Sequence, residues 1–277
     1  MTETSVPDDP QHRVVAELNA LAGSYDTLRF VQVSARRLVE LAALPLGAQV
    51  LDVATGTGWA ALAAAQYVGP TGKVLGVDLA PDLLECARQK VAAAGLTHVE
   101  FQEGDAERLD VADQRFDVVL CASALFFVPD MLAALREWWR VLKPGGQVGF
   151  SWWGSTFSQP LRDLLNARLQ QYGVPLLAPS PNQRLVEPET CRQLLHEAGF
   201  VQIGVRSEQL GYYCRTVEEY WAELSASLPW RPVLQLAPAQ REQLKAEHLA
   251  EVRALATDQG IWIDVATNFA RGWKRTT

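Results

Sequence analysis

The chain has 277 residues, of which 48% are hydrophobic and 21% are charged, and its formal net charge is −7. This composition is typical of a globular protein with one sizeable core, and no apolar run approaches the roughly 20 residues needed to span a bilayer. The acidic balance disfavours a nucleic-acid partner, because binding a phosphate backbone requires a basic surface.

The N-terminal segment 1–10 carries acidic groups and two prolines, and it lacks the basic start and apolar stretch of an export signal. We therefore expect a flexible tail at 1–10 and a cytoplasmic protein. The four cysteines (Cys86, Cys121, Cys191 and Cys214) are far apart in the sequence and form no C-x-x-C pair. They are predicted to be reduced thiols, and no metal site is expected.

Two helical patterns come first, at Gln11–Ala22 and Leu28–Leu44, and are expected to form an N-terminal cap. From residue 49 short apolar runs alternate with longer helical patterns, which is typical of βαβ units around a parallel sheet. The expected strands are Gln49–Ala54, Lys73–Asp78, Val99–Gln102, Phe116–Ala122 and Gln147–Trp152. The expected helices between them are Trp59–Val68, Asp82–Ala94 and Asp130–Leu142.

The pattern becomes irregular after residue 154. Helices are expected at Leu161–Tyr172, Glu189–Ala198, near Val217–Ser227 and at Pro238–Thr257. The last two strands are predicted at Val201–Cys214 and Trp262–Lys274. The proline-rich stretch Val174–Pro188 is interpreted as a loop or lid inserted into one domain.

The segment Val50–Gly58 reads as a buried strand that runs into a glycine-rich turn. Gly56 and Gly58 allow tight turning and the close approach of a ligand that a Cβ atom would block. The next helix offers unpaired N–H groups at its N-terminus. Glycines after a strand can also simply make a turn, and with Ala61 the spacing satisfies the dinucleotide fingerprint as well. The turn predicts a nucleotide-like ligand without choosing between classes of enzyme.

Asp78 closes the second predicted strand, about twenty residues after the glycines, where an acidic side chain can accept hydrogen bonds from both hydroxyls of a ribose. A solvated aspartate that caps the helix at Pro81 is the plainer alternative. Strand-end position and spacing agree, so we favour ribose binding. NAD-binding enzymes share this feature.

Three further features follow in order: Gly104-Asp105-Ala106 after the third strand, Ser123 through Asp130 after the fourth, and the turn Lys143–Gly146 before the fifth. With the glycine turn and Asp78, this succession resembles class I S-adenosylmethionine-dependent methyltransferases, particularly the ubiquinone/menaquinone-biosynthesis type. The resemblance covers roughly Ala16–Phe150 and extends loosely to the C-terminus.

The resemblance implies an α/β fold, a Rossmann-like, doubly wound seven-stranded sheet whose last strand is antiparallel, with an N-terminal helical cap and a C-terminal helical lid. It implies one methyltransferase domain at 11–277, divided into the cap at 11–44, the cofactor-binding core at 45–154, the lid at 155–188 and the C-terminal strands and helices at 189–277. The implied cofactor is S-adenosyl-L-methionine. The residues implied to bind it are Tyr25, Asp52, Ala54, Thr55, Gly56, Thr57, Gly58, Asp78, Leu79, Asp105, Ala106 and Ser123.

Within that set, Asp52 would lie near the amino group of the cofactor, Asp105 and Ala106 would hold its adenine, and Ser123 would face its sulfur. Tyr25 matches a tyrosine that covers the cofactor in these relatives, although it could equally be a packing residue between the cap helices.

Many relatives carry histidines just before the V-P-D sequence of the fourth-strand loop, where this chain has Phe126 and Phe127. Phenyl rings cannot serve as a general base, so no catalytic residue is assigned. The acceptor is then either a nucleophile that needs little help or one assisted by water, Ser123 or a tyrosine. With Trp152 and Trp153 they suggest a substrate site for a small apolar or aromatic molecule. The two tryptophans could equally pack beneath the Ser155–Pro188 segment.

Two other functions remain open from the sequence. An NAD(P)-dependent oxidoreductase explains the glycines and Asp78 but has no use for Gly104-Asp105-Ala106 or for the Lys143–Gly146 turn. A non-catalytic protein that binds S-adenosylmethionine is the second alternative. The methyl acceptor, the atom methylated and the oligomeric state are not specified by the sequence.

Overall fold

The computed structural model describes residues 10–175, 181–185 and 187–276. Within them, seven strands form one sheet in the order β3-β2-β1-β4-β5-β9-β6. The first five strands along the chain are parallel to one another, and β9 is antiparallel to both β5 and β6. The predicted seven-stranded sheet with an antiparallel last strand is confirmed. The strands are β1 Gln49–Val53, β2 Lys73–Asp78, β3 Val99–Glu103, β4 Phe116–Cys121, β5 Leu142–Trp153, β6 Val201–Gln209 and β9 Ala266–Trp273.

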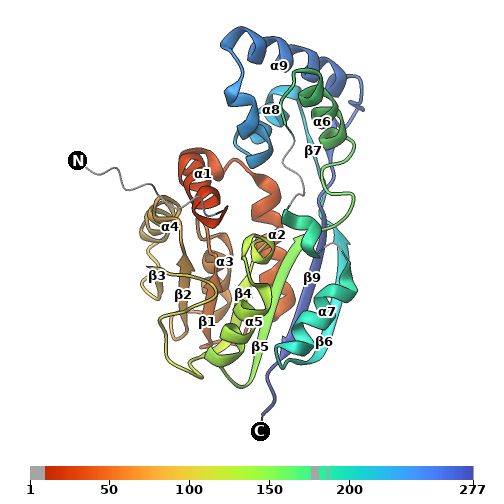
Figure 1. Ribbon diagram of the computed structural model, residues 1–277. Coiled ribbons are helices and arrows are strands. Elements are labelled where there is room, and N and C mark those ends of the chain that lie inside the picture. Colours follow the sequence, from red (N-terminus) through yellow and green to blue (C-terminus); the bar gives the residue numbers. More distant parts are fainter. Residues whose placement is uncertain (1–9, 176–180, 186, 277) are drawn as a thin grey trace, which may run out of the picture.

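Helices cover both faces of this sheet (Figure 1). On one face lie α2 Arg29–Ala42, α3 Trp59–Val68 and α4 Pro81–Ala93; on the other lie α5 Met131–Val141 and α7 Pro188–Glu197. The helix α1 Pro10–Tyr25 packs beside α4. These bounds agree with the predicted helices to within a few residues, because their apolar spacing and glycine or proline ends are local signals.

Alternate residues of each strand enter different cores. Val50 and Leu120 pack under α2 and α3, whereas Leu51 and Val119 pack on the side of α5 and α7. All four side chains are fully buried. Burying an aliphatic side chain of this size contributes about 1.5–3 kcal/mol, so the central strands anchor the fold.

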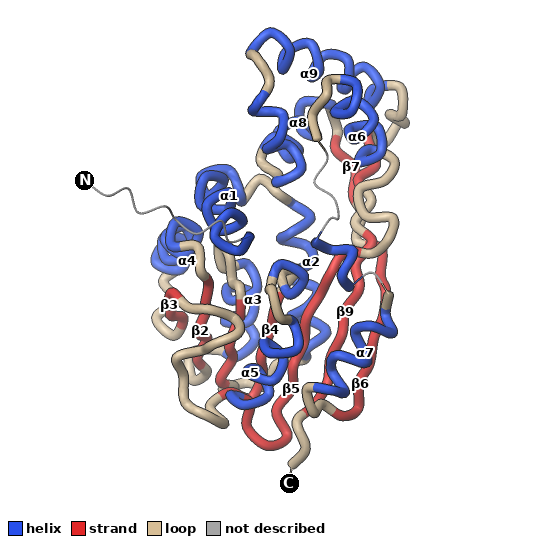
Figure 2. Tube along the Cα trace, viewed as in Figure 1, coloured by secondary structure: helices blue, strands red, loops and turns tan. Residues whose placement is uncertain are grey.

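A second group of elements stands above the end of the sheet opposite the C-terminus (Figures 1 and 2). It contains α6 Leu161–Gln171, α8 Val217–Ser225, α9 Pro238–Arg253, the 3₁₀ helix η3 Leu228–Gln235, and a two-stranded sheet of β7 Tyr212–Cys214 and β8 Ile261–Ile263. Leu165, Trp230 and Leu244 form a small core of its own there. The remaining 3₁₀ helices are η1 Leu125–Phe127 and η2 Pro181–Leu185.

The two last predicted strands differ from the structure, because each of them breaks in two. Val201–Cys214 becomes β6 and β7, and Trp262–Lys274 becomes β8 and β9. Gln209 links the two segments at the break, because its side-chain oxygen accepts hydrogen bonds from the backbone N–H groups of Gly211 (2.8 Å) and Val265 (2.9 Å). At Gly211 an added Cβ would lie 2.3 Å from the Trp262 ring. The corner therefore depends on a contact between distant segments.

The predicted tail at 1–10 lies outside the described residues except for Pro10, and so does 176–180 within the proline-rich stretch. Of that stretch, the described part contains η2. None of the described helices is long and apolar enough to cross a membrane.

Candidate functional site

A cleft opens at the carboxyl ends of β1, β2 and β4, between the sheet and the helices α1 and α2. Ligands of open α/β sheets bind at this edge, where the chain reverses the order of its strands. The lining residues are Val14, Val15, Leu18, Tyr25, Val31, Ala35, Ala54, Thr55, Gly56, Thr57, Trp59, Ala60, Asp78, Leu79, Leu83, Gly104, Ala106, Ala122, Ser123, Ala124, Phe127 and Val128.

The turn after β1 forms the floor of the cleft. Ala54 (φ 53°), Gly56 (φ 55°) and Gly58 (φ 84°) all have left-handed backbone conformations, which makes the turn tight enough to lead straight into α3. Ala54 has a Cβ and is therefore strained there, as residues at functional sites commonly are. An added Cβ on Gly56 would lie 3.9 Å from the Tyr25 ring, so this glycine faces the cleft.

Gly58 does not line the cleft, and an added Cβ would lie 3.0 Å from Ala87 and 3.1 Å from the Phe101 ring. The absence of a Cβ at this position therefore allows close packing of the turn against α4 and β3. The sequence alone shows only that a small residue stands at this position.

Asp78 lies at the end of β2 and borders the cleft. Its carboxylate accepts hydrogen bonds from the backbone N–H groups of Gly56 (2.7 Å) and Ala80 (2.9 Å). Burial raises the pKa of this carboxyl, and the two N–H groups oppose the rise by stabilising the ionised form. Asp78 therefore both fixes the glycine turn and presents an acceptor at the cleft wall.

Asp52 lies beneath the floor of the cleft and is fully buried. One carboxylate oxygen accepts a hydrogen bond from the Thr55 hydroxyl (2.5 Å), and the other has no partner among the described residues. The pKa of Asp52 is raised to about 7, chiefly by burial and also by the charge of Asp78, while the Thr55 hydroxyl and the Ala61 backbone N–H oppose the rise. Its side chain supports the turn from below and keeps one acceptor oxygen unused.

Tyr25 ends α1 and closes the cleft from above, next to Gly56. Burial raises the pKa of its hydroxyl, and the negative charges of Asp78 and Asp26 add to the effect. Of the two roles left open for Tyr25, the position over the cleft is the one that the structure supports.

The adenine-side candidates lie after β3. Gly104, Ala106 and Leu79 line the cleft, whereas Asp105 does not. The Asp105 carboxylate instead accepts a hydrogen bond from the backbone N–H of Glu107 (3.0 Å), which holds the loop in a turn.

Ser123 follows β4 with a left-handed φ of 54°, and its hydroxyl belongs to a cluster of three. The hydroxyl oxygens of Ser34 and Ser151 each lie 3.1 Å from that of Ser123 and 3.3 Å from each other. The backbone N–H of Ser123 also donates to the Ser151 hydroxyl (3.0 Å). This cluster can both donate and accept hydrogen bonds at the cleft wall. Ser34 and Ser151 were not predicted, because they come from α2 and β5, far away in the sequence.

Of the four aromatic residues proposed for the substrate site, one lines the cleft and three do not. Phe127 lines the cleft, and Phe126 is buried behind it with the two ring centroids 4.6 Å apart. Trp152 is fully buried and packs with its centroid 5.8 Å from that of Phe150. Trp153 stacks on Phe157 at 4.4 Å. Neither tryptophan borders the cleft.

The helix η2 holds the loops at this edge together. The side chain of Asn182 makes two hydrogen bonds with the backbone of Trp153, one to its N–H (3.0 Å) and one to its carbonyl (2.9 Å). Arg184 donates to the carbonyl oxygens of Phe126 (3.3 Å), Val128 (2.6 Å) and Pro129 (2.7 Å). Trp153 therefore packs beneath the inserted segment, as the packing alternative predicts.

The sequence of this chain is similar to those of known methyltransferases. A family model described as a methyltransferase domain matches residues 50–146. The chain is 31% identical to the ubiquinone/menaquinone biosynthesis C-methyltransferase UbiE of Pseudomonas putida, over 72% of this chain and 85% of that protein. It is 37% identical to a demethylmenaquinone methyltransferase of Listeria monocytogenes over 53% of this chain, and this match spans 63% of the relative's length.

Solved structures share the fold. The YcgJ protein of Bacillus subtilis superposes with a TM-score of 0.57 at 22% identity, covering 87% of this chain and 98% of that one. The [4+2]-cyclase SpnF superposes with a TM-score of 0.55 at 21% identity, covering 87% and 82%. Fold, site and sequence together define the class: this chain belongs to the class I S-adenosylmethionine-dependent methyltransferases of the ubiquinone/menaquinone type.

Proposed function

We propose that this protein transfers the methyl group of S-adenosylmethionine to a small apolar or aromatic molecule. The proposal depends on one observation: five residues from separate segments of the chain line the same cleft. They are Tyr25, Gly56, Asp78, Ala106 and Ser123. Each of these residues is one that the family pattern implies for the cofactor.

The residues present fit this cofactor chemically. Asp78 would accept hydrogen bonds from the ribose hydroxyls, and Leu79 and Ala106 would contact the adenine from the apolar side. Asp52 is fully buried beneath the floor, and one of its oxygens has no partner among the described residues, next to the turn that would carry the methionine portion. Gly56 leaves the floor open because it has no Cβ atom.

S-adenosylmethionine supplies an activated methyl group on a positively charged sulfur, so the protein has chiefly to align the acceptor and to exclude water. Val14, Val15 and Leu18 on α1 line the cleft and would keep water out of it. The Ser123 hydroxyl, held by Ser34 and Ser151, would orient a polar group of the acceptor. Phe127 would contact the acceptor's apolar part, and Phe126 would support it from behind.

A reduced quinone is the acceptor class we propose to test first. One relative named above is a demethylmenaquinone methyltransferase and the other a C-methyltransferase of ubiquinone/menaquinone biosynthesis. The apolar wall of Val31, Ala35 and Phe127 suits a flat aromatic ring.

The four cysteines of the chain are free thiols, all within the described residues, which supports the proposed cytoplasmic location.

The decisive experiment follows the label from methyl-labelled S-adenosylmethionine into a reduced naphthoquinone, with mass spectrometry of the product. Because a [4+2]-cyclase shares this fold, the readout has to be a methylated product and not binding alone. Thermal stabilisation by S-adenosylhomocysteine and not by NADH would exclude the oxidoreductase alternative. Binding of S-adenosylhomocysteine without label transfer to any member of an acceptor panel would favour the non-catalytic alternative.

A further inference from the structure

Asp26 is a polar residue that the cofactor pattern does not account for. It directly follows α1 and does not line the cleft. Its carboxylate nevertheless accepts hydrogen bonds from the Thr57 hydroxyl (2.6 Å) and the Trp59 indole N–H (2.9 Å), and it pairs with the Lys90 ammonium (2.9 Å). A single carboxylate thus joins the end of α1 to the glycine turn, to α3 and to α4.

Two of these three partners are walls of the cleft. Thr57 and Trp59 both line it, and Tyr25, the neighbour of Asp26 in the chain, closes it from above. Lys90 lies over the face of the Trp59 ring, 4.3 Å from its centroid, so the ring is held by its edge and by its face. The orientation of three cleft residues therefore depends on the position of one side chain.

The cluster is also partly shielded from water. The Lys90 side chain is 23% exposed and that of Asp26 is 41% exposed. Burial lowers the pKa of Lys90, and the hydrogen bond and the charge of Asp26 oppose that change. Three donors from three different elements converge on this carboxylate, as is expected of a fixed anchor rather than of a group that binds ligand directly.

We infer that Asp26 is a positioning residue that closes α1 over the S-adenosylmethionine site and thereby sets the affinity for this cofactor. The inference rests on the proposed function. When Asp26 holds Tyr25, Thr57 and Trp59 in place, a bound cofactor leaves only after α1 has moved. Loss of the anchor acts chiefly on the rate at which the cofactor dissociates.

The test uses the full chain and S-adenosylhomocysteine as the probe, with calorimetry for affinity and stopped-flow fluorescence for dissociation. Asp26→Asn keeps the size of the side chain but removes its charge, and we expect about tenfold weaker binding with faster dissociation. Because the Asp26–Lys90 pair is partly exposed, the unfolding midpoint of the ligand-free protein should fall by no more than about 3 °C. The matched control is Asp163→Asn on α6, a 61% exposed side chain near Arg162, which should leave the affinity unchanged.

Lys90→Met is the second variant, since it retains both other donors to Asp26. We expect a smaller loss of affinity, and a double variant that loses less than the sum of the two, because both changes remove one shared interaction. Hydrogen exchange of the α1 amides should slow when S-adenosylhomocysteine binds to the wild-type protein, and this protection should be weaker in both variants.

The outcomes separate the inference from the function on which it rests. Unchanged affinity, unchanged dissociation and unchanged α1 protection in Asp26→Asn and in Lys90→Met, beside normal binding by the wild-type protein, would overturn the inference alone. A lower unfolding midpoint with unchanged dissociation would do the same, because it would show a merely structural role. Failure of the wild-type protein to bind S-adenosylhomocysteine would overturn the proposed function and this inference together.

Discussion

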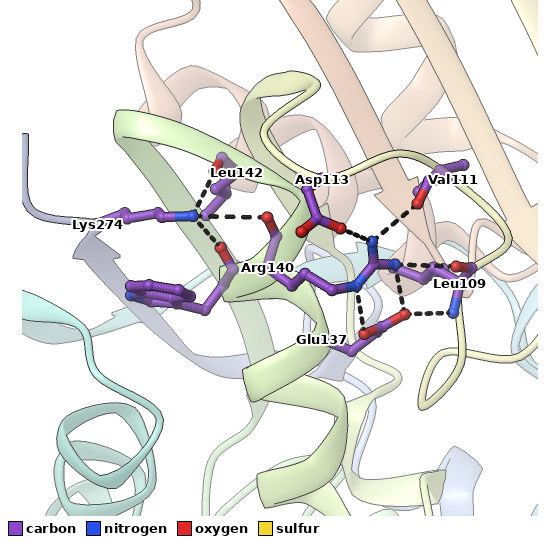
Figure 3. A network of polar contacts seen from close by, with 8 residues as sticks. Leu109, Val111, Asp113, Glu137, Arg140, Leu142 and Lys274 are labelled. Atoms are coloured by element: carbon purple, nitrogen blue, oxygen red, sulfur yellow. Dashed lines mark hydrogen bonds and ion pairs between the residues drawn. The ribbon is translucent and has the colours of Figure 1, made fainter.

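The two ends of the sheet use charged side chains in opposite ways. At the amino end of the parallel strands, Arg140 donates all five of its N–H groups to Glu137, Asp113 and the carbonyl oxygens of Leu109 and Val111 (Figure 3). The Lys274 ammonium donates to three backbone carbonyl oxygens around the end of α5. At the carboxyl end, by contrast, Asp52 keeps an unpaired oxygen and Asp78 stands at an open cleft.

We propose from this difference that the amino end of the sheet is structural and that its carboxyl end is functional. Charged groups whose hydrogen bonds are all made within the protein stabilise the fold and have none left for a ligand. Buried groups with an unused acceptor cost stability, and such costs are tolerated where a ligand is bound. Substitutions at the two ends should therefore separate stability from binding.

The largest effect is expected for Asp78→Ala at the functional end. Removing the carboxylate takes away the proposed ribose acceptor and the partner of the Gly56 N–H, so affinity for S-adenosylhomocysteine should fall by about 3 kcal/mol, or roughly 100-fold. Isothermal titration calorimetry measures this change directly.

Asp117→Ala is the matched control for that measurement. Asp117 accepts a hydrogen bond from the backbone N–H of Gln49 (2.8 Å) and pairs with Lys143 at the amino end of the sheet. Its replacement should lower stability and leave affinity unchanged. Equal losses of affinity in the two variants would contradict the division between the ends.

The next effect is expected for Lys274→Met at the structural end. The substitution leaves three carbonyl oxygens without their charged donor, and the free energy of unfolding should fall by about 2–3 kcal/mol. Chemical denaturation reports the loss, and the affinity of the folded protein for S-adenosylhomocysteine serves as the internal control. A weaker affinity with intact stability would mean that Lys274 belongs to the functional end.

A third effect concerns a buried polar pair in the upper helices, where His248 accepts or donates a hydrogen bond with the Tyr220 hydroxyl (2.7 Å). Burial lowers the pKa of His248 to about 4 from its usual 6.5. The unfolded chain therefore binds a proton in a pH range where the folded protein does not. Stability supplied by the neutral histidine is complete above pH 6.5 and declines as the pH falls towards 4, by an amount on the order of 2 kcal/mol.

His248→Gln should reduce the dependence of the free energy of unfolding on pH in this range. Urea denaturation at about pH 7.5, 6 and 5, which covers the upper part of the titration, measures this dependence. His196→Gln on α7 makes the same chemical change outside this pair and should retain the wild-type slope. An unchanged slope in His248→Gln would show that another group causes the dependence.

The smallest effect on ligand affinity is expected for Arg184→Met, at the rim of the cleft. Arg184 is exposed, but its guanidinium holds the loop that carries Phe127 and Val128. Loss of these hydrogen bonds should weaken S-adenosylhomocysteine binding by about 1 kcal/mol, or roughly fivefold, with little change in stability. Arg162→Met, on α6, is the corresponding control; a stability loss in Arg184→Met with unchanged binding would assign η2 to the structural frame.

Most of the sheet could be predicted from the sequence because its signals are local. Apolar runs such as Lys73–Asp78 and glycine or proline boundaries such as Pro81 depend on neighbouring residues alone. The breaks at Gln209 and Gly211 could not be predicted, because they depend on Val265 and Trp262 in the opposing segment. A strand pattern in one segment carries no information about the corner that another segment imposes on it.

The candidate site divides along the same line. Gly56, Asp78 and Ala106 follow strand ends, and the topology of a parallel sheet brings strand ends to one edge. Asp26 stands beside Tyr25 in the sequence, yet its three partners come from residues 31 to 64 positions away. For Trp152 and Trp153 the sequence left a substrate site and packing equally open, and only the tertiary structure shows their ring contacts with Phe150 and Phe157.

The most direct test of the central claim is a crystal structure of this protein grown with S-adenosylhomocysteine. We expect the ligand in the cleft, with Asp78 at its ribose hydroxyls, Ala106 at its adenine and Tyr25 closed over it. S-adenosylhomocysteine bound elsewhere, or a cleft that admits NADH and excludes S-adenosylhomocysteine, would contradict it.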